Sequence, residues 1–277
     1  MHKKAILKSV FIVGSPRSGT TLLQSILGTH PDFHTFPESH FFYSLYGSSR
    51  LRRRLGLVDR VRAHKALEAF LNNIDAAELK SEIPNSAWYE RKWILTFKNI
   101  LGQIAKEQHK RGWIEKTPMH LHFISQISKY IPESKFIHIV RDGKDTIASV
   151  YYYASQYPEQ WGRNKSLESC IGRWKLDIKI HQRYLSKNNH CFVKYNTLVD
   201  NPGKEIKKIC NFLSIDFQEN MLLRRNTGKI ILKKEFWKQT VGRDITIQSG
   251  KLSLLKEEEQ SLIQKSVAAY PLDILFV

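Results

Sequence analysis

Apolar runs that suit buried strands alternate with longer segments of helical periodicity along most of the chain. The runs rich in β-branched or aromatic residues predict strands at residues 6–13, 113–114, 135–140 and 191–194. The apolar spacing between them predicts helices at residues 20–27, 50–82, 88–109, 119–130, from 141 onward, 167–185, 202–213 and 256–269. Strands that alternate with helices favour an α/β fold, in which helices flank a central parallel sheet on both faces.

The first predicted strand runs into a glycine-bearing loop with the sequence GSPRSGTT, from Gly14 to Thr21. This loop matches the triphosphate-binding pattern G-x-x-x-x-G-K-[ST] at both glycines and at the last threonine, but Thr20 stands where the lysine is required. That lysine contacts the β- and γ-phosphates, so its absence argues against transfer of a γ-phosphoryl group. Loop amides and a helix start still favour an anion, and Arg17 adds a cation, so the loop predicts a site for a terminal phosphate.

A second candidate phosphate contact follows the strand predicted at residues 135–140. Arg141 stands at the carboxyl end of this strand, where open α/β sheets place their ligands. Ser149 lies eight residues further, about two helical turns along. Arg141 could instead pair with Asp142 or Asp145, and Ser149 could lie on an ordinary helix face. Together with the loop, however, Arg141 and Ser149 indicate two cationic sites, one for each of two separate phosphates. A kinase would not need the second site.

The string PRSGTTLL at residues 16–23 resembles the 5′-phosphosulfate loop of sulfotransferases that use 3′-phosphoadenosine 5′-phosphosulfate (PAPS). Its arginine makes it most similar to the tyrosylprotein and bacterial-type branch of that family. The resemblance extends from about residue 11 to about residue 256 and implies one P-loop-type sulfotransferase domain over residues 1–277. It also implies adenosine 3′,5′-bisphosphate (PAP) as the product. Sulfonate transfer requires no metal in principle, and the sequence offers no compact cluster of carboxylates or histidines with metal-ligand spacing.

The resemblance assigns roles to the candidate donor-binding residues. The loop holds the 5′ end of the donor, Arg141 and Ser149 clamp its 3′-phosphate, and Tyr195 contacts the nucleotide by stacking or through its hydroxyl. Residues 247–251 match, more weakly, a segment that folds over the nucleotide. The full set is Pro16, Arg17, Ser18, Gly19, Thr20, Thr21, Leu22, Arg141, Ser149, Tyr195, Ser249, Gly250 and Lys251.

Transfer of a sulfonate to a hydroxyl needs a base, cations around the sulfonate and a donor to the departing phosphate. In its distance from the loop, Glu38 resembles the general base of the tyrosylprotein branch, and His34 and His40 are rival bases. Lys116 matches a family lysine near the bridging oxygen of the donor, and Arg17 supplies the second catalytic cation.

Two further features bear on the chemistry. The cytosolic branch carries a catalytic histidine two residues after its lysine, but this sequence has Pro118 there, which strengthens Glu38 as the base. Thr117 is expected to cap the helix that Pro118 opens. Residues 41–112 show little recognisable pattern, and the resemblance implies a mainly helical insertion that frames the acceptor. The arginine-rich stretch at 50–62 is interpreted as a solvated face or a ligand contact.

Composition narrows the classes of partner. The chain carries 44 Lys and Arg against 26 Asp and Glu, a formal net charge of +18, which implies anionic partners. The polyanionic donor accounts for part of this excess. The acceptor stays open between an acidic glycan, an acidic peptide with a tyrosine and a small molecule. Basic residues are spread over the whole length without a nucleic-acid motif, so a nucleic-acid-binding role is disfavoured.

The remaining composition concerns compartment and class. Hydrophobic residues make up 42% of the chain, which excludes a disordered protein. Three cysteines without a C-x-x-C pair predict buried reduced thiols rather than a disulfide framework or a zinc site. Because the early apolar run is too short for a signal peptide or a membrane span, we expect a cytoplasmic protein. The alternative function is a P-loop kinase or NTPase with a degenerate loop.

Overall fold

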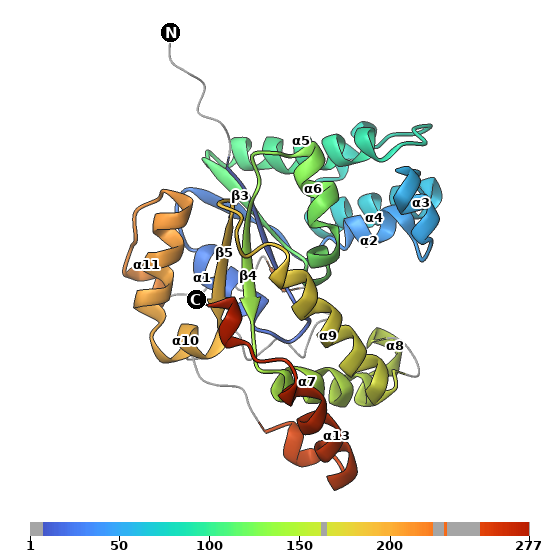
Figure 1. Ribbon diagram of the computed structural model, residues 1–277. Coiled ribbons are helices and arrows are strands. Elements are labelled where there is room, and N and C mark those ends of the chain that lie inside the picture. Colours follow the sequence, from blue (N-terminus) through green and yellow to red (C-terminus); the bar gives the residue numbers. More distant parts are fainter. Residues whose placement is uncertain (1–7, 162–164, 224–229, 232–249, 277) are drawn as a thin grey trace.

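The computed structural model describes residues 8–161, 165–223, 230–231 and 250–276. In this part of the chain the strands form one parallel sheet in the order β2-β3-β1-β4-β5 (Figure 1). The strands are β1 (Lys8–Gly14), β2 (Phe33–Thr35), β3 (Gly112–Lys116), β4 (Lys135–Val140) and β5 (His190–Lys194). The predicted α/β fold with a central parallel sheet is therefore confirmed, and β1 pairs with β3 on one side and β4 on the other.

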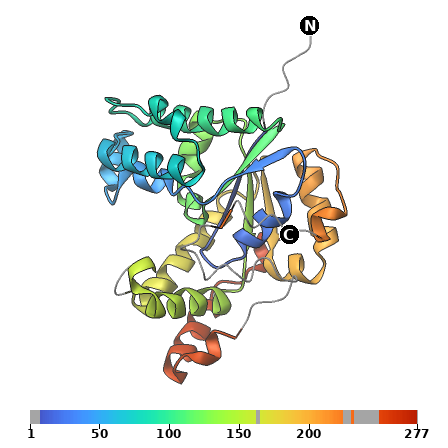
Figure 2. The same cartoon turned by 180° about the vertical axis from the view of Figure 1, so that it is seen from behind.

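Helices cover both faces of the sheet, as the two opposite views show (Figures 1 and 2). No helix in the described part combines the length and the apolar character that crossing a membrane requires. The α-helices are α1 (Thr20–Leu27), α2 (Phe41–Tyr46), α3 (Arg50–Leu55), α4 (Arg60–Asn73), α5 (Glu90–Glu107), α6 (Ile124–Tyr130), α7 (Gly143–Gln156), α8 (Pro158–Trp161), α9 (Leu167–Gln182), α10 (Tyr195–Asp200), α11 (Pro202–Leu213), α12 (Asn220–Leu223) and α13 (Glu257–Ala268). The 3-10 helices are η1 (Ala77–Glu82), η2 (Pro118–Phe123), η4 (Leu252–Leu254) and η5 (Asp273–Leu275).

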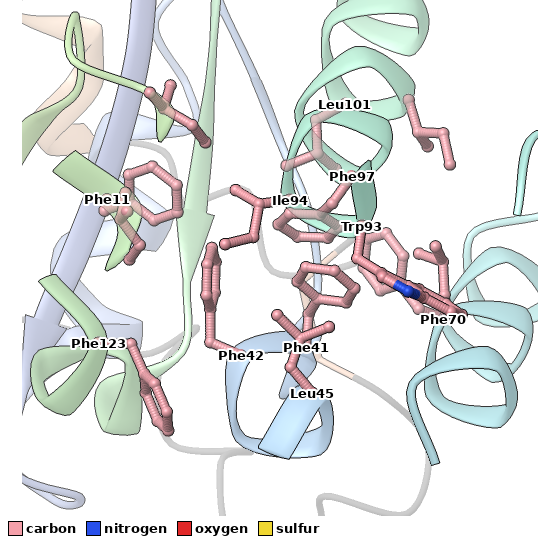
Figure 3. Close-up of a cluster of buried hydrophobic side chains, with 14 of the residues drawn as sticks. Phe11, Phe41, Phe42, Leu45, Phe70, Trp93, Ile94, Phe97, Leu101 and Phe123 are labelled. Carbon is pink, nitrogen blue, oxygen red and sulfur yellow. The ribbon is translucent and has the colours of Figure 1, made fainter. Parts of the chain in front are cut away.

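The alternation of side chains along β1 divides the core between the two faces of the sheet. Val10 and Ile12 pack with residues of α1 and α11, whereas Phe11 packs with residues of α2 and α5. On this second face Phe41 of α2 stacks on Phe97 of α5, with ring centroids 4.3 Å apart (Figure 3). This aromatic cluster anchors α2, the helix that directly follows the segment containing Glu38.

The predicted elements agree most closely with the structure where a glycine, a proline or the limit of an apolar run marks their ends. The ranges 20–27, 135–140 and 202–213 coincide with α1, β4 and α11. The predicted helical range 50–82 is divided into α3, α4 and η1, because Gly56 with φ 66° ends α3 and the Asp59 side chain caps α4. The three-residue edge strand β2 and the short helix α10 have no counterpart among the predicted elements.

Three histidines form a buried hydrogen-bonded chain across one face of the sheet. His138 of β4 lies 2.8 Å from His181 of α9 and 2.7 Å from His190 of β5, measured between ring nitrogens. Burial lowers the pKa of His138 well below its ordinary value, that of His181 to about 3 and that of His190 to about 4. The His190 ring stacks on Phe136 and on Tyr184, with centroids 4.7 Å away in each case.

We predict that these three hydrogen-bonded histidines make the folded state less stable in mild acid. The unfolded histidines titrate near their ordinary pKa of about 6.5, and the folded ones titrate lower. The contribution of the neutral histidines to the free energy of unfolding is therefore fully present above about pH 6.5, and it is lost as the pH falls toward 4. His190→Phe keeps the aromatic stack and removes one titrating group. In urea unfolding series between pH 7 and 4, this variant should show a weaker pH dependence than the wild type, by about one proton. Identical pH dependences would contradict the assignment.

Candidate active site

The loop between β1 and α1 is the first of the two anion sites predicted from the sequence. At Gly19 the backbone φ is +100°, and a Cβ atom there would lie 2.4 Å from the Tyr195 ring. Helix α1 begins at Thr20, and its N-cap residue, Gly19, has no side chain that could cap it. The first-turn amides of a helix have no partner within the helix and point out of its N-terminus, here toward the loop. The Ser18 hydroxyl is buried and has no hydrogen-bond partner among the described residues. An uncapped helix start and an unsatisfied buried hydroxyl fit a bound phosphate.

Arg17 connects this loop to the second motif. Its backbone adopts a left-handed φ of 71°. Its Nε donates a hydrogen bond of 3.1 Å to the Ser149 hydroxyl, and its guanidinium lies 4.4 Å from the centroid of the Tyr153 ring. Burial lowers the pKa of Arg17, and so does the nearby charge of Arg141, whereas Glu38 acts to raise it. Arg17 thus lies within electrostatic reach of both the arginine after β4 and the candidate base.

Arg141 lies beside the same loop. One of its amino groups donates to the backbone oxygen of Arg17 at 3.3 Å, and the other contacts an oxygen of Asp145 at 3.1 Å. The Arg141 guanidinium also lies 4.4 Å from the centroid of the Tyr195 ring. Arg141 therefore pairs with Asp145, as one interpretation of the sequence expects, and it also adjoins the loop, while its role as a phosphate contact stays a prediction. The two anion-site motifs meet in one place.

The end of β3 brings a buried lysine to the candidate base. The Lys116 side chain is fully buried, and its ammonium donates to Glu38 at 2.5 Å and to the Thr21 hydroxyl at 3.1 Å. It is therefore not the surface lysine that a strand end could carry. The Glu38 side chain keeps 11% of its surface exposed, so it is not fully closed off from solvent. The hydrogen bond to Thr21 places this ion pair beside residues 14–21, the predicted phosphate loop.

The rival bases occupy different positions. His40, 57% exposed, places its Nε2 atom 3.5 Å from the second carboxylate oxygen of Glu38. His34 lies on β2, where its ring packs against Phe36 with centroids 4.6 Å apart. The geometry therefore brings His40 to the candidate base as a neighbour and associates His34 with packing.

The remaining sequence candidates are only partly placed. The buried Tyr195 ring packs against Gly19 at the floor of the loop. The Lys251 ammonium lies 4.4 Å from the centroid of the Tyr152 ring and 5.8 Å from that of Tyr153, the ring that also carries Arg17. Gly250 has a φ of +100°, and Ser249 lies outside the described residues.

Two buried carboxylates that were not among the candidates from the sequence accept hydrogen bonds from segments of the site. Asp177 of α9 accepts a 2.8 Å hydrogen bond from the hydroxyl of Ser15 in the phosphate loop and lies 2.7 Å from His122. Glu115, directly before Lys116, accepts hydrogen bonds of 2.7 Å from the hydroxyls of Ser39 and Thr117. A signal for Glu115 was its place next to the candidate lysine, whereas nothing local to Asp177 indicates a partner far away in sequence.

The expected helix cap at Thr117 is wrong. Its side chain makes no capping hydrogen bond to η2. The hydroxyl donates to Glu115 instead and accepts from the backbone amides of Ser39 at 3.2 Å and His40 at 3.4 Å. Long-range partners therefore displaced the local cap.

The cysteines behave as predicted. Cys170, Cys191 and Cys210 are buried free thiols. Burial raises the pKa of Cys191 and of Cys210 to about 11, so both stay protonated and inert at neutral pH. Among the described residues, no three or more His, Cys, Asp and Glu side chains are grouped so that they could hold a metal ion.

Comparison with known proteins identifies the family. A model described as the sulfotransferase family matches residues 9–219, so the chain belongs to that family and is a sulfotransferase. Protein-tyrosine sulfotransferase 1 of Danio rerio is 26% identical over 273 residues, covering 96% of this chain and 67% of that protein. The protein-tyrosine sulfotransferase of Drosophila melanogaster is 29% identical over 220 residues, which cover 77% of this chain but only 39% of that protein.

Solved structures show the same fold. The sulfotransferase domain of the Synechococcus PCC 7002 olefin synthase aligns with a TM-score of 0.58 and 20% identity over 98% of each chain. Mouse sulfotransferase SULT7A1, solved in complex with PAP, aligns with a TM-score of 0.52 and 15% identity, covering 94% of this chain and 83% of that one. At these identities the likeness supports the α/β fold with its parallel sheet.

We predict that the shape of the loop backbone decides nucleotide binding. Gly19→Ala forces a side chain into the Tyr195 ring at a positive φ, so the affinity for PAP should fall at least about tenfold. Gly172 in α9 has no neighbour within 4 Å of a built Cβ, so Gly172→Ala is the matched control and should leave affinity unchanged. Calorimetric titration with PAP measures both variants. Wild-type affinity in Gly19→Ala would contradict the prediction.

Proposed function

We propose that the protein transfers a sulfonate group from PAPS to a hydroxyl of an acceptor, by in-line displacement with Glu38 as the general base. The observation that carries this proposal is the convergence of the two anion-site motifs. The loop arginine Arg17 touches Ser149, and Arg141 touches the loop backbone. Two adjacent cationic sites suit a donor that carries phosphate groups at both its 5′ and its 3′ positions.

Each donor-binding residue has a role in this proposal. Residues 16–22 bind the 5′ end through loop amides, the Ser18 hydroxyl and the Thr20 and Thr21 side chains. Arg141 and Ser149 bind the 3′-phosphate, with Ser249, Gly250 and Lys251 contributing from the segment before α13. Tyr195 borders the nucleotide, since its ring lies against both Gly19 and Arg141. No step of the proposed reaction is assigned to a metal.

The catalytic roles follow from the groups that meet at Glu38. Glu38 removes the proton of the acceptor hydroxyl while the acceptor oxygen forms a bond to sulfur. The bond between sulfur and the 5′-phosphate oxygen breaks, and its electron pair leaves with the phosphate. Lys116 stabilises the charge on that phosphate, and Arg17 stabilises the sulfonate oxygens. The buried position of Lys116 strengthens this stabilisation, because little water screens its charge.

The acceptor is proposed from charge and from the relatives. Residues 41–112, with α2 to α5, are the part of the chain that we assign to framing the acceptor. Six arginines and one aspartate lie between residues 50 and 62, which favours an acidic acceptor. Because the relatives are protein-tyrosine sulfotransferases, an acidic peptide containing tyrosine is the first acceptor to test, before a glycan and a small phenol. The proposal requires no nucleic-acid partner, and a cytoplasmic location stays a prediction.

We predict that Glu38→Gln lowers kcat by ~10²–10⁴-fold and Lys116→Met by ~10²–10³-fold. Glu38→Gln should keep its affinity for PAP within a few-fold. The rate of PAP release from PAPS, with an acidic tyrosine peptide, a glycan and 4-nitrophenol as acceptors, measures the effect. Lys98 and Glu133 form a pair at the same 2.5 Å distance elsewhere, so Lys98→Met and Glu133→Gln are matched controls. Near-normal turnover in Glu38→Gln would move the base to another group, and His40→Ala then tests His40.

We also predict that the site distinguishes PAP from nucleoside triphosphates. The loop lacks the lysine that binds β- and γ-phosphates, and Arg141 with Ser149 adds a place for a 3′-phosphate. ATP with Mg²⁺ should therefore compete poorly with PAP in a displacement titration, and Arg141→Ala should weaken PAP more than ATP. Equal competition by ATP and PAP would instead favour a kinase or NTPase.

A further inference from the structure

The two residues that follow Glu38 are tied to the end of β3 by buried hydrogen bonds. The backbone amides of Ser39 and His40 both donate to the Thr117 hydroxyl, at 3.2 and 3.4 Å. The Ser39 hydroxyl donates to Glu115 at 2.7 Å. The backbone beside the candidate base is therefore fixed to the strand that carries its lysine partner.

The strand geometry explains how one segment performs both tasks. Successive side chains of a strand point to opposite faces, so Glu115 and Thr117 lie on one face and Lys116 on the other. The first face holds the backbone after Glu38, and the second presents the ammonium to the Glu38 carboxylate. A shift of the segment on one face would move the carboxylate on the other.

Glu115 is suited to hold this arrangement and is not placed to react. It is fully buried, and its hydrogen-bond donors among the described residues are Ser39, Thr117 and His120, at 2.7, 2.7 and 2.8 Å. Burial acts to raise the pKa of Glu115, but the neighbouring His120 and the hydrogen bonds from Thr117 and Ser39 together lower it below its ordinary value. An ionised carboxylate therefore accepts from all three groups at neutral pH.

The segment is also held from its other side. Gln24 of α1 donates to the backbone oxygen of Phe36 at 2.6 Å and to the Thr35 hydroxyl at 2.8 Å. Residues before Glu38 are thus fixed to the helix that follows the phosphate loop, and residues after it are fixed to β3.

We propose that Glu115 and Thr117 are positioning residues that set the distance and direction of the Glu38 carboxylate relative to Lys116 and the phosphate loop. This inference rests on the proposed role of Glu38 as the general base. Glu115 orients the Thr117 hydroxyl by accepting a hydrogen bond from it, and the Thr117 oxygen in turn accepts hydrogen bonds from the two backbone amides. Misplacement of a catalytic group by about 1 Å costs up to ~10²-fold in rate.

The first test measures the hydrogen bonds from Ser39 and His40 to Thr117, called the anchor below, and needs no activity assay. Thr117→Val has nearly the same shape and lacks the hydroxyl. Amide hydrogen exchange of Ser39 and His40, followed by NMR in the full chain, should be slow in the wild type and in Thr117→Ser. Exchange should be at least about tenfold faster in Thr117→Val. Equal protection in wild type and Thr117→Val would overturn the proposed anchor.

The second test asks whether the anchor acts through Glu38. With PAPS and the acidic tyrosine peptide, Thr117→Val should lower kcat by ~10-fold or more, and Thr117→Ser should restore it. In the Glu38→Gln background, with each rate measured above the enzyme-free background, adding Thr117→Val should change kcat less than twofold. Calorimetry with PAP should give an affinity within a few-fold of the wild type for every variant.

A matched control separates positioning from general destabilisation. Tyr130 donates its hydroxyl to the buried Glu90 carboxylate at 2.9 Å, so Tyr130→Phe removes a comparable hydrogen bond away from the site. It should lower the melting temperature without lowering kcat. An equal loss of kcat from Thr117→Val in the wild-type and Glu38→Gln backgrounds would contradict the positioning role, and so would full activity of Thr117→Val. If Glu38→Gln is itself fully active, the proposed base is wrong, which is a different result.

Discussion

The parallel pairing of β1 with both β3 and β4 is the constraint on which the candidate site depends. Its register places Lys116 beside Ile12 and Ile139 beside Gly14. Since the carboxyl ends of parallel strands meet at one edge of a sheet, the loop after β1, the lysine that ends β3 and the arginine after β4 arrive together. The sheet thus assembles three cations, Arg17, Lys116 and Arg141, from segments that span 124 residues of the sequence.

This assembly is electrostatically costly in the absence of an anion. Burying a charge costs several kcal/mol unless it is paired, and Lys116 is paired with Glu38. Arg17 and Arg141 lie close enough for the charge of Arg141 to lower the pKa of Arg17. Asp145 offsets part of the charge on Arg141. A polyanionic donor supplies the remaining compensation, which connects the arrangement of the cations to the proposed ligand.

The sequence predicted the elements whose signals are local. Helix α1 starts after a glycine and ends before one, and β4 is a continuous apolar run, so their bounds follow from residues within each segment. The candidate residues Arg17, Lys116 and Arg141 were found by motif and resemblance. Their mutual contacts required the sheet register. The hydrogen bond from Ser39 to Glu115 joins residues 76 positions apart, and the same network took the Thr117 hydroxyl from its expected cap.

The most direct measurement is a crystal structure of the protein with PAP bound. We expect the 5′-phosphate to contact the amides of residues 18–21 and the 3′-phosphate to lie within hydrogen-bond distance of Arg141 and Ser149. We also expect Lys116 to lie beside the 5′-phosphate. A nucleotide bound elsewhere, or one whose 3′-phosphate contacts neither Arg141 nor Ser149, would contradict the idea that the two motifs form one donor site.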